Sequence, residues 1–139
     1  MHSKAPLFAL ISSFVLILMT FAPASPAQNS APNPYQVPVM NGGIGDCSAD
    51  FTVTDNAGAP IYDAKVRVHI VYGFMYARKL DLEQGTNIDG KARFTGLPSR
   101  TKKGLFFQAT QGDREGSAFV DPDKTCKADL KIVLEKKSQ

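Results

Sequence analysis

Two stretches that combine alternating residues with turn-forming residues constrain this chain more than any other part of its sequence. The first runs from Phe51 to Ile70, and in it apolar residues alternate with polar ones on both sides of an Asp-Asn-Ala-Gly turn. The second runs from Thr86 to Pro98 and has Asp89-Gly90 at its turn. A period of two is typical of a half-buried β-strand, and Asp, Asn, Gly and Pro are preferred in tight turns. Both stretches predict a small all-β domain.

Other segments alternate in the same way, and each is expected to bury one face. The apolar rows are Val66-Val68-Ile70, Leu105-Phe107-Ala109 and Leu130-Ile132-Leu134. Helical spacing is confined to residues 76–83, which would permit a single turn. Short strands separated by turns favour two antiparallel sheets packed face to face. The predicted fold class is therefore all-β, a seven-stranded antiparallel Ig-like or prealbumin-like sandwich over residues 47–136.

The spacing of the turn residues resembles that of a known family. The residues involved are Val53-x-Asp55-x-x-Gly58-x-Pro60-Ile61-x-x-Ala64-x-Val66 and Thr86-x-x-x-Gly90-x-x-x-Phe94-x-Gly96-Leu97-Pro98. This pattern resembles the carboxypeptidase regulatory-like domains, which are prealbumin-like (transthyretin-like) β-sandwiches of exported bacterial proteins. The resemblance implies a fold and says little about activity. The chain departs from the pattern in residues 99–104 and 73–85, and these two stretches are where function is sought.

The N-terminal residues have the pattern of a secretory signal. His2 and Lys4 precede an apolar run from Leu7 to Phe21, and small residues follow as far as Ala24 and Ala27. An uncleaved anchor is the alternative, but a spanning helix needs about 20 apolar residues. We predict a signal peptide over residues 1–27, cleaved after Ala27 or Ala24. The mature protein would be secreted or periplasmic, with no membrane insertion.

Residues 28–46 are rich in Pro, Asn and Gly and show no period, so they are predicted to form a flexible tether. The alternative is that Tyr35, Val37, Val39 and Met40 form an extended peptide that adds to the sheet edge of a partner.

Cys47 and Cys126 flank the strands of the predicted domain. An oxidising compartment favours a disulfide between them. The alternatives are two free thiols or a metal pair. With His69 as the one histidine after residue 27 and no Cys-x-x-Cys spacing, a zinc site lacks ligands. We therefore predict a disulfide and no metal.

Charge and residue types narrow the function classes. The net charge is +3, and the basic residues do not interleave with aromatic ones, so no nucleic-acid partner is expected. Intradiol dioxygenases resemble this fold but hold iron with two His and two Tyr, whereas residues 28–139 contain His69 alone. His69 lies on the polar side of its strand, and no Ser or Cys motif supplies a nucleophile. A non-enzymatic domain without a cofactor is predicted, with a small hydrolase as the less favoured alternative.

The candidate binding residues lie in the two stretches that depart from the family pattern. Tyr72 and Phe74 are expected to close one end of the core. Exposed aromatic residues around an arginine suit recognition, and the predicted binding residues are Met75, Tyr76, Arg78, Arg100, Lys102 and Lys103. The predicted function is a binding or cell-envelope accessory module that recognises a protein or a polysaccharide. A spacer within an envelope assembly is the alternative.

Overall fold

The computed structural model describes residues 31–138, and the predicted signal peptide lies outside the described residues. Nearly all regular structure in the described part is β. The elements are β1 (Val39–Asn41), β2 (Cys47–Thr54), β3 (Lys65–Tyr72), the short 3-10 helix η1 (Phe74–Tyr76), β4 (Arg78–Gly85), β5 (Lys91–Leu97), β6 (Leu105–Gln111), β7 (Arg114–Val120), β8 (Lys127–Val133) and β9 (Glu135–Lys136).

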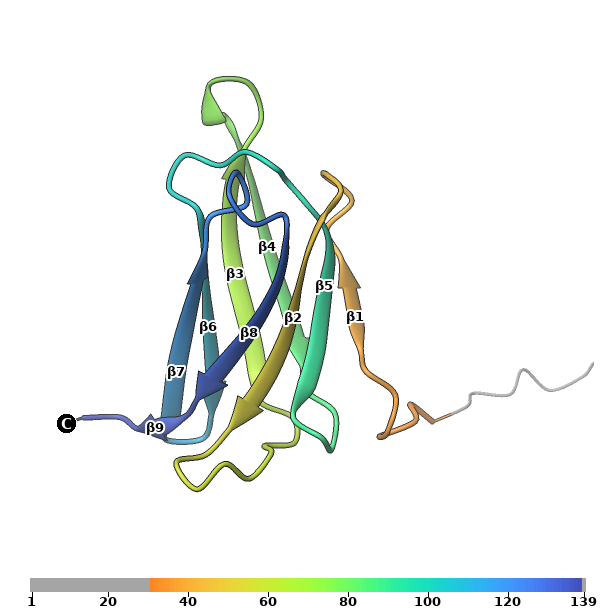
Figure 1. The fold of residues 1–139 in the computed structure, drawn as a ribbon, viewed down its shortest axis with the longest axis vertical. Helices are drawn as coiled ribbons and strands as arrows, with labels where there is room; N and C mark the ends of the chain where they lie inside the picture. The colour runs from red at the N-terminus through yellow and green to blue at the C-terminus, as the bar shows by residue number, and fades with distance from the viewer. Residues whose placement is uncertain (1–30, 139) are drawn as a thin grey trace, which may run out of the picture.

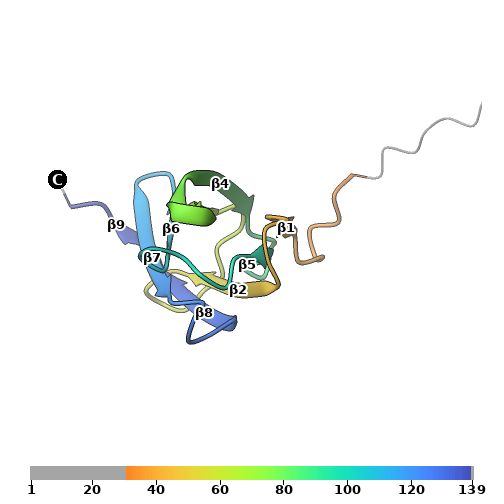
Figure 2. The ribbon, with the colours of Figure 1, turned by 90° about the horizontal axis from the view of Figure 1, so that it is seen from above.

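The strands form two sheets that enclose one core (Figures 1 and 2). A four-stranded sheet has the order β1-β5-β2-β8, and a five-stranded sheet has the order β4-β3-β6-β7-β9. Phe51, Phe94 and Phe107 meet between the sheets with ring centroids 4.6 to 5.6 Å apart. Burial of such rings is a main source of folding free energy. The two-layer all-β prediction is thus borne out.

The alternation in the sequence correctly indicates which side chains point inward. In β3, Val66, Val68 and Ile70 are buried while Arg67 and His69 are exposed. The inward rows of β6 and β8 are likewise as expected, with Leu130 partly rather than fully buried.

The prediction of seven antiparallel strands is wrong in two respects. The described residues contain nine strands, because the short β1 and β9 add to the sheet edges. In addition, β1 pairs with β5 and β2 pairs with β8 in parallel. Alternation indicates the face on which a side chain lies, but it does not identify the neighbouring strand.

β1 falls within residues 28–46, the stretch predicted to be a flexible tether. The Arg93 amide donates to Pro38 O and the Gly42 amide donates to Thr95 O, both at 2.9 Å, so backbone bonds hold this part against β5. Met40 also packs against the core. The tether prediction therefore fails at β1, because main-chain pairing compensates for the low apolar content. This extended peptide adds to the sheet edge of its own domain.

β3 and β4 form a long hairpin, in register from Lys65↔Gly85 to Tyr72↔Arg78. The single helical turn considered for residues 76–83 is wrong, since this stretch lies largely in β4. Leu80 and Leu82 are two residues apart and face the core side, as the period of a strand requires.

The ends of the described chain and the β3–β4 turn lie at opposite ends of the domain. Residues 31–38 and β9 are at the lower end in Figure 1, and η1 is at the upper end. Within residues 31–138, the structure contains no helix with the length and apolar character needed to cross a membrane.

The predicted disulfide is confirmed. Cys47 opens β2 and Cys126 directly precedes β8, with their Cα atoms 4.6 Å apart. The Ser48 amide donates to Cys126 O at 2.8 Å. The bond joins positions 79 residues apart. A disulfide is compatible with an oxidising location such as the periplasm or the extracellular space.

Breaking this disulfide should lower the free energy of unfolding by about 2–5 kcal/mol, because the unfolded chain regains the freedom that the closed loop removes. Cys126→Ala is the suitable variant, since Cys126 is exposed and the buried Cys47 stays in place. Urea denaturation measures the loss. Thr125→Ala, an exposed neighbour that leaves the bond intact, is the control. A loss below about 1 kcal/mol relative to this control would contradict the proposed contribution.

Candidate functional site

Residues 73–78, here called the tip, comprise the turn between β3 and β4 and the first residue of β4, and the turn extends beyond the upper end of the sheets (Figure 1). Gly73 opens the turn at φ 81°, and the Tyr76 amide donates to Gly73 O at 3.0 Å. Met75 and Tyr76 follow with φ of 52° and 53°. The turn is thus built by consecutive non-glycine residues in the left-handed region.

The side chains of the tip are large, apolar and open to solvent. Phe74 is 90% exposed, Met75 80% and Tyr76 41%. The expectation that Phe74 closes the core is therefore wrong, because the turn carries it past the last inward position of β3. Tyr72 is half-buried and packs against the core, as expected. Arg78 opens β4, and its Cγ and Cδ lie 3.5 Å from where a Cβ on Gly73 would be.

The backbone of the tip is held in an unfavourable conformation. A left-handed conformation costs an L-residue roughly 1–2 kcal/mol relative to the right-handed region. Neither Met75 nor Tyr76 is an Asn or Asp, the residues that tolerate it best. The tip combines this strain with exposed apolar side chains. The third non-glycine residue with positive φ among residues 31–138 is Asp63, at 55°, and aspartate tolerates this conformation better.

The predicted basic residues lie in the loop between β5 and β6, at the same end of the domain (Figure 1). Arg100 Nε is 4.0 Å from Asp123 Oδ1. Lys102 and Lys103 line a hollow of about 370 Å³ together with His69, Val71, Gly104 and Phe106. The structure therefore brings these two lysines to Phe106, and the tip residues do not line this hollow.

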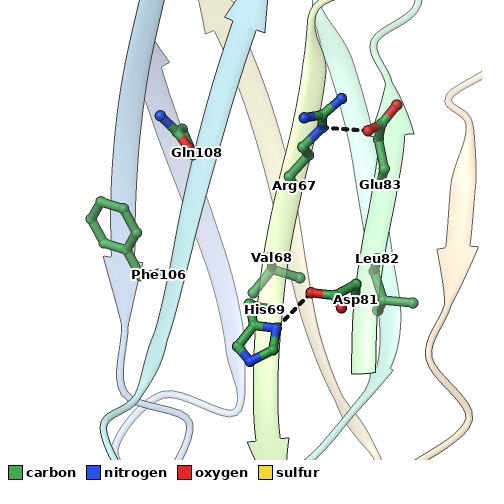
Figure 3. A pocket seen from close by; sticks show the side chains of 8 residues that line it. All are labelled: Arg67, Val68, His69, Asp81, Leu82, Glu83, Phe106 and Gln108. Atoms are coloured by element: carbon green, nitrogen blue, oxygen red, sulfur yellow. Dashed lines mark hydrogen bonds and ion pairs between the residues drawn. The ribbon is translucent and has the colours of Figure 1, made fainter. Parts of the chain in front are cut away.

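A second hollow, the outer depression, adjoins the first on the solvent face of the five-stranded sheet (Figure 3). Its volume is about 470 Å³. Phe106, on β6, is 58% exposed. His69 Nδ1 lies 2.6 Å from Asp81 Oδ1, and Arg67 pairs with Glu83 across the same two strands. The lining residues are Arg67, Val68, His69, Asp81, Leu82, Glu83, Phe106 and Gln108.

Sequence reasoning missed the acidic partners of this face. The sequence assigns no partner to His69, and the structure places the Asp81 carboxylate 2.6 Å from its Nδ1. A β3–β4 hairpin centred on Met75 would have predicted this pair, because His69 and Asp81 are equally far from Met75 along the chain. None of the residues lining the outer depression is Ser, Thr or Cys. Among residues 31–138, no group of three or more His, Cys, Asp and Glu is arranged to hold a metal ion.

Two of the ion pairs outside the depression shift the pKa of their basic residue. Asp63 Oδ1 accepts a hydrogen bond from Lys65 Nζ at 2.6 Å, and this bond raises the pKa of Lys65 above its ordinary value. A hydrogen bond to Asp50 likewise raises the pKa of Arg93. Both shifts favour the charged form, so neither group titrates near neutral pH.

Comparisons with known proteins define a weak structural likeness. No family model matches the sequence, and no curated protein matches it. A solved 3-chlorocatechol 1,2-dioxygenase from Rhodococcus opacus aligns with a TM-score of 0.40 and 16% identity, over 84% of this chain and 69% of that one. A variant of catechol 1,2-dioxygenase from Acinetobacter radioresistens aligns with a TM-score of 0.42 and 13% identity, over 76% of this chain and 60% of that one.

Both solved structures are enzymes, which contradicts the prediction of a non-enzymatic domain, and we do not maintain that prediction. The physical reason is that one fold carries many functions, so a fold class cannot exclude catalysis. TM-scores of 0.40 and 0.42 carry no argument about a particular reaction, metal or substrate.

Replacement of Met75 by Gly should raise the free energy of unfolding by about 1 kcal/mol, because glycine adopts the left-handed region without a steric cost. Thermal and urea denaturation of the variant measure this gain. Met75→Ala is the matched control, since it removes the side chain but keeps the Cβ that causes the strain. Equal stabilities for the two variants would show that the tip backbone is not strained.

Proposed function

We propose that this domain is a secreted or periplasmic binding module that recognises a partner protein through the tip. The single observation that carries the proposal is the strained, solvent-exposed apolar turn at residues 73–78. Exposed aromatic residues, methionine and arginine are enriched at protein interfaces, and energetically dominant contacts cluster in Tyr, Trp and Arg. Tyr76 and Arg78 are the residues of the tip that combine an apolar body with a polar end.

The shape and rigidity of the tip support a protein partner. A narrow protruding turn can insert into a concave surface, and its order before binding reduces the entropy lost on association. The backbone bond from the Tyr76 amide to Gly73 O and the register of β3 with β4 hold the turn in one conformation. Two strained residues are retained where unstrained glycines would serve the turn alone, which favours a role for their side chains.

The resemblance to carboxypeptidase regulatory-like domains remains our proposal for the family, supported by the turn residues at Asp55, Gly58 and Gly90. Asp55 Oδ1 accepts from the Ala57 and Ala59 amides at 2.9 Å, and Gly58 and Gly90 have φ of 81° and 70°. These residues therefore build turns. Export by a cleaved signal peptide is part of the same proposal, and the disulfide supports it.

Tyr76→Ala with Arg78→Ala should weaken binding to the partner at least tenfold, because residues of this type dominate interface energetics. The mature wild-type protein is crosslinked in a native envelope extract, the captured protein is identified and purified, and its Kd is measured with both forms. The thermal midpoint should stay nearly unchanged, since both side chains lie at the surface.

Tyr62→Ala with Lys131→Ala is the matched control, because Tyr62 is 56% exposed, Lys131 is exposed on β8 opposite Thr52 of β2, and neither residue belongs to the tip. Unchanged affinity of the tip variant would refute the proposal and favour a spacer role. A ligand that survives protease treatment of the extract would refute the protein partner.

A further inference from the structure

Phe106 is the common member of three adjoining hollows on the solvent face of the five-stranded sheet. The outer depression of about 470 Å³, the lysine-lined hollow of about 370 Å³ and a third of about 160 Å³ all include it. Gln108 and Ser117 line the third hollow beside it. A series of shallow hollows around one ring suits an extended chain better than a compact small molecule.

The middle of this face lies on interior strands and exposes mainly side chains. β3 and β6 are interior strands, and they pair with each other from Lys65↔Thr110 to Val68↔Phe107. This pairing ends before His69 and Phe106. A peptide that adds to a sheet needs a free edge. The exposed groups are one aromatic ring and polar side chains around it, chiefly the amide of Gln108, the hydroxyl of Ser117 and the free ring nitrogen of His69.

These groups match both the flat C–H face of a sugar ring and the hydroxyl groups around its edge. The face of a phenyl ring carries partial negative charge, and it attracts the C–H groups on the flat side of a pyranose. Amide, hydroxyl and imidazole groups donate to and accept from the sugar hydroxyls around the edge. Phe119, directly opposite Phe106 on β7 and also exposed, extends the aromatic surface along the same face.

Charge indicates which kind of sugar fits. Of the carboxylates around Phe106, Glu83 pairs with Arg67 and Glu115 with Lys137, and Asp81 lies within hydrogen-bond distance of His69 Nδ1. Lys102 and Lys103 belong to no ion pair among residues 31–138. These two lysines outnumber Asp81, the one carboxylate around Phe106 without a cationic partner when His69 is neutral, so the net charge around the aromatic platform is positive and complements a negatively charged saccharide.

We propose that this face binds a carboxylated polysaccharide, with Phe106 stacked on a sugar ring and Lys102 and Lys103 bound to carboxylate groups of the chain. The site is separate from the tip and does not rest on the partner protein proposed above. A domain with both sites would link a protein to an acidic polymer.

Titration of the mature protein with hexagalacturonate, followed by amide NMR, tests the proposal. We expect saturable shifts at Phe106, Gln108 and Lys103, with a Kd below about 1 mM. The neutral hexasaccharide maltohexaose should bind at least tenfold more weakly. Absence of shifts with hexagalacturonate at about ten times that Kd would overturn the proposal.

Two pairs of variants separate stacking from charge. Phe106→Thr should weaken hexagalacturonate binding at least tenfold, while Tyr62→Thr, which replaces an equally exposed aromatic residue, should not change it. Lys102→Gln with Lys103→Gln should weaken it at least fivefold, and Lys127→Gln with Lys131→Gln, the same charge change on β8, should have little effect. Phe106 is exposed, so Phe106→Thr is expected to fold, and amide NMR verifies this directly.

Hexa-aspartate is the control for general attraction between the lysines and an anion. If it binds as tightly as hexagalacturonate, and Phe106→Thr leaves both affinities unchanged, the face attracts acidic chains of any kind and the saccharide site is refuted. Discrimination between the two acidic chains that disappears in Phe106→Thr supports the proposal.

Discussion

Contact among Phe51, Phe94 and Phe107 is the interaction on which the rest of the structure depends. The three rings come from β2, β5 and β6, so they join the two sheets at the centre of the domain. Because side chains alternate along a strand, an inward Phe107 requires an outward Phe106. The same constraint places His69 on the solvent face once Val68 and Ile70 are buried. The features of the outer face are therefore tied directly to the packing of the core.

Much of the core could be predicted from the sequence, because a period of two specifies both a strand and its buried side. Val66, Val68 and Ile70 lie inward as that period requires, and Gly58 and Gly90 occupy turns with positive φ. Cys47 and Cys126 also pair as their positions and an oxidising compartment predict. These successes rest on local chemistry. The alternation within one strand does not indicate which strand, distant along the chain, pairs with it.

The candidate sites show where that local information ends. β1 is held by backbone hydrogen bonds, which leave no signature in the side chains of residues 39–41. Leu80 and Leu82 are too few to distinguish strand spacing from a helical turn, so β4 was missed, and with it the pairing of Asp81 with His69. Phe74 could not be assigned to the surface, because its exposure depends on the left-handed backbone of the two residues that follow it.

The two ends of the described chain lie at the end of the domain opposite the tip. Residues 31–38 leave β1 at the end of the domain opposite the tip, and the strand β9 reaches that same lower end (Figure 1). A segment attached before residue 31 or after β9 would therefore join the domain at this lower end, whereas η1 lies at the upper end. Attachment by the N-terminal or the C-terminal side would point the aromatic turn in the same direction, away from the point of attachment. The length of β3 and β4 thus sets the distance between the tip and the end of the domain where the described chain begins and ends.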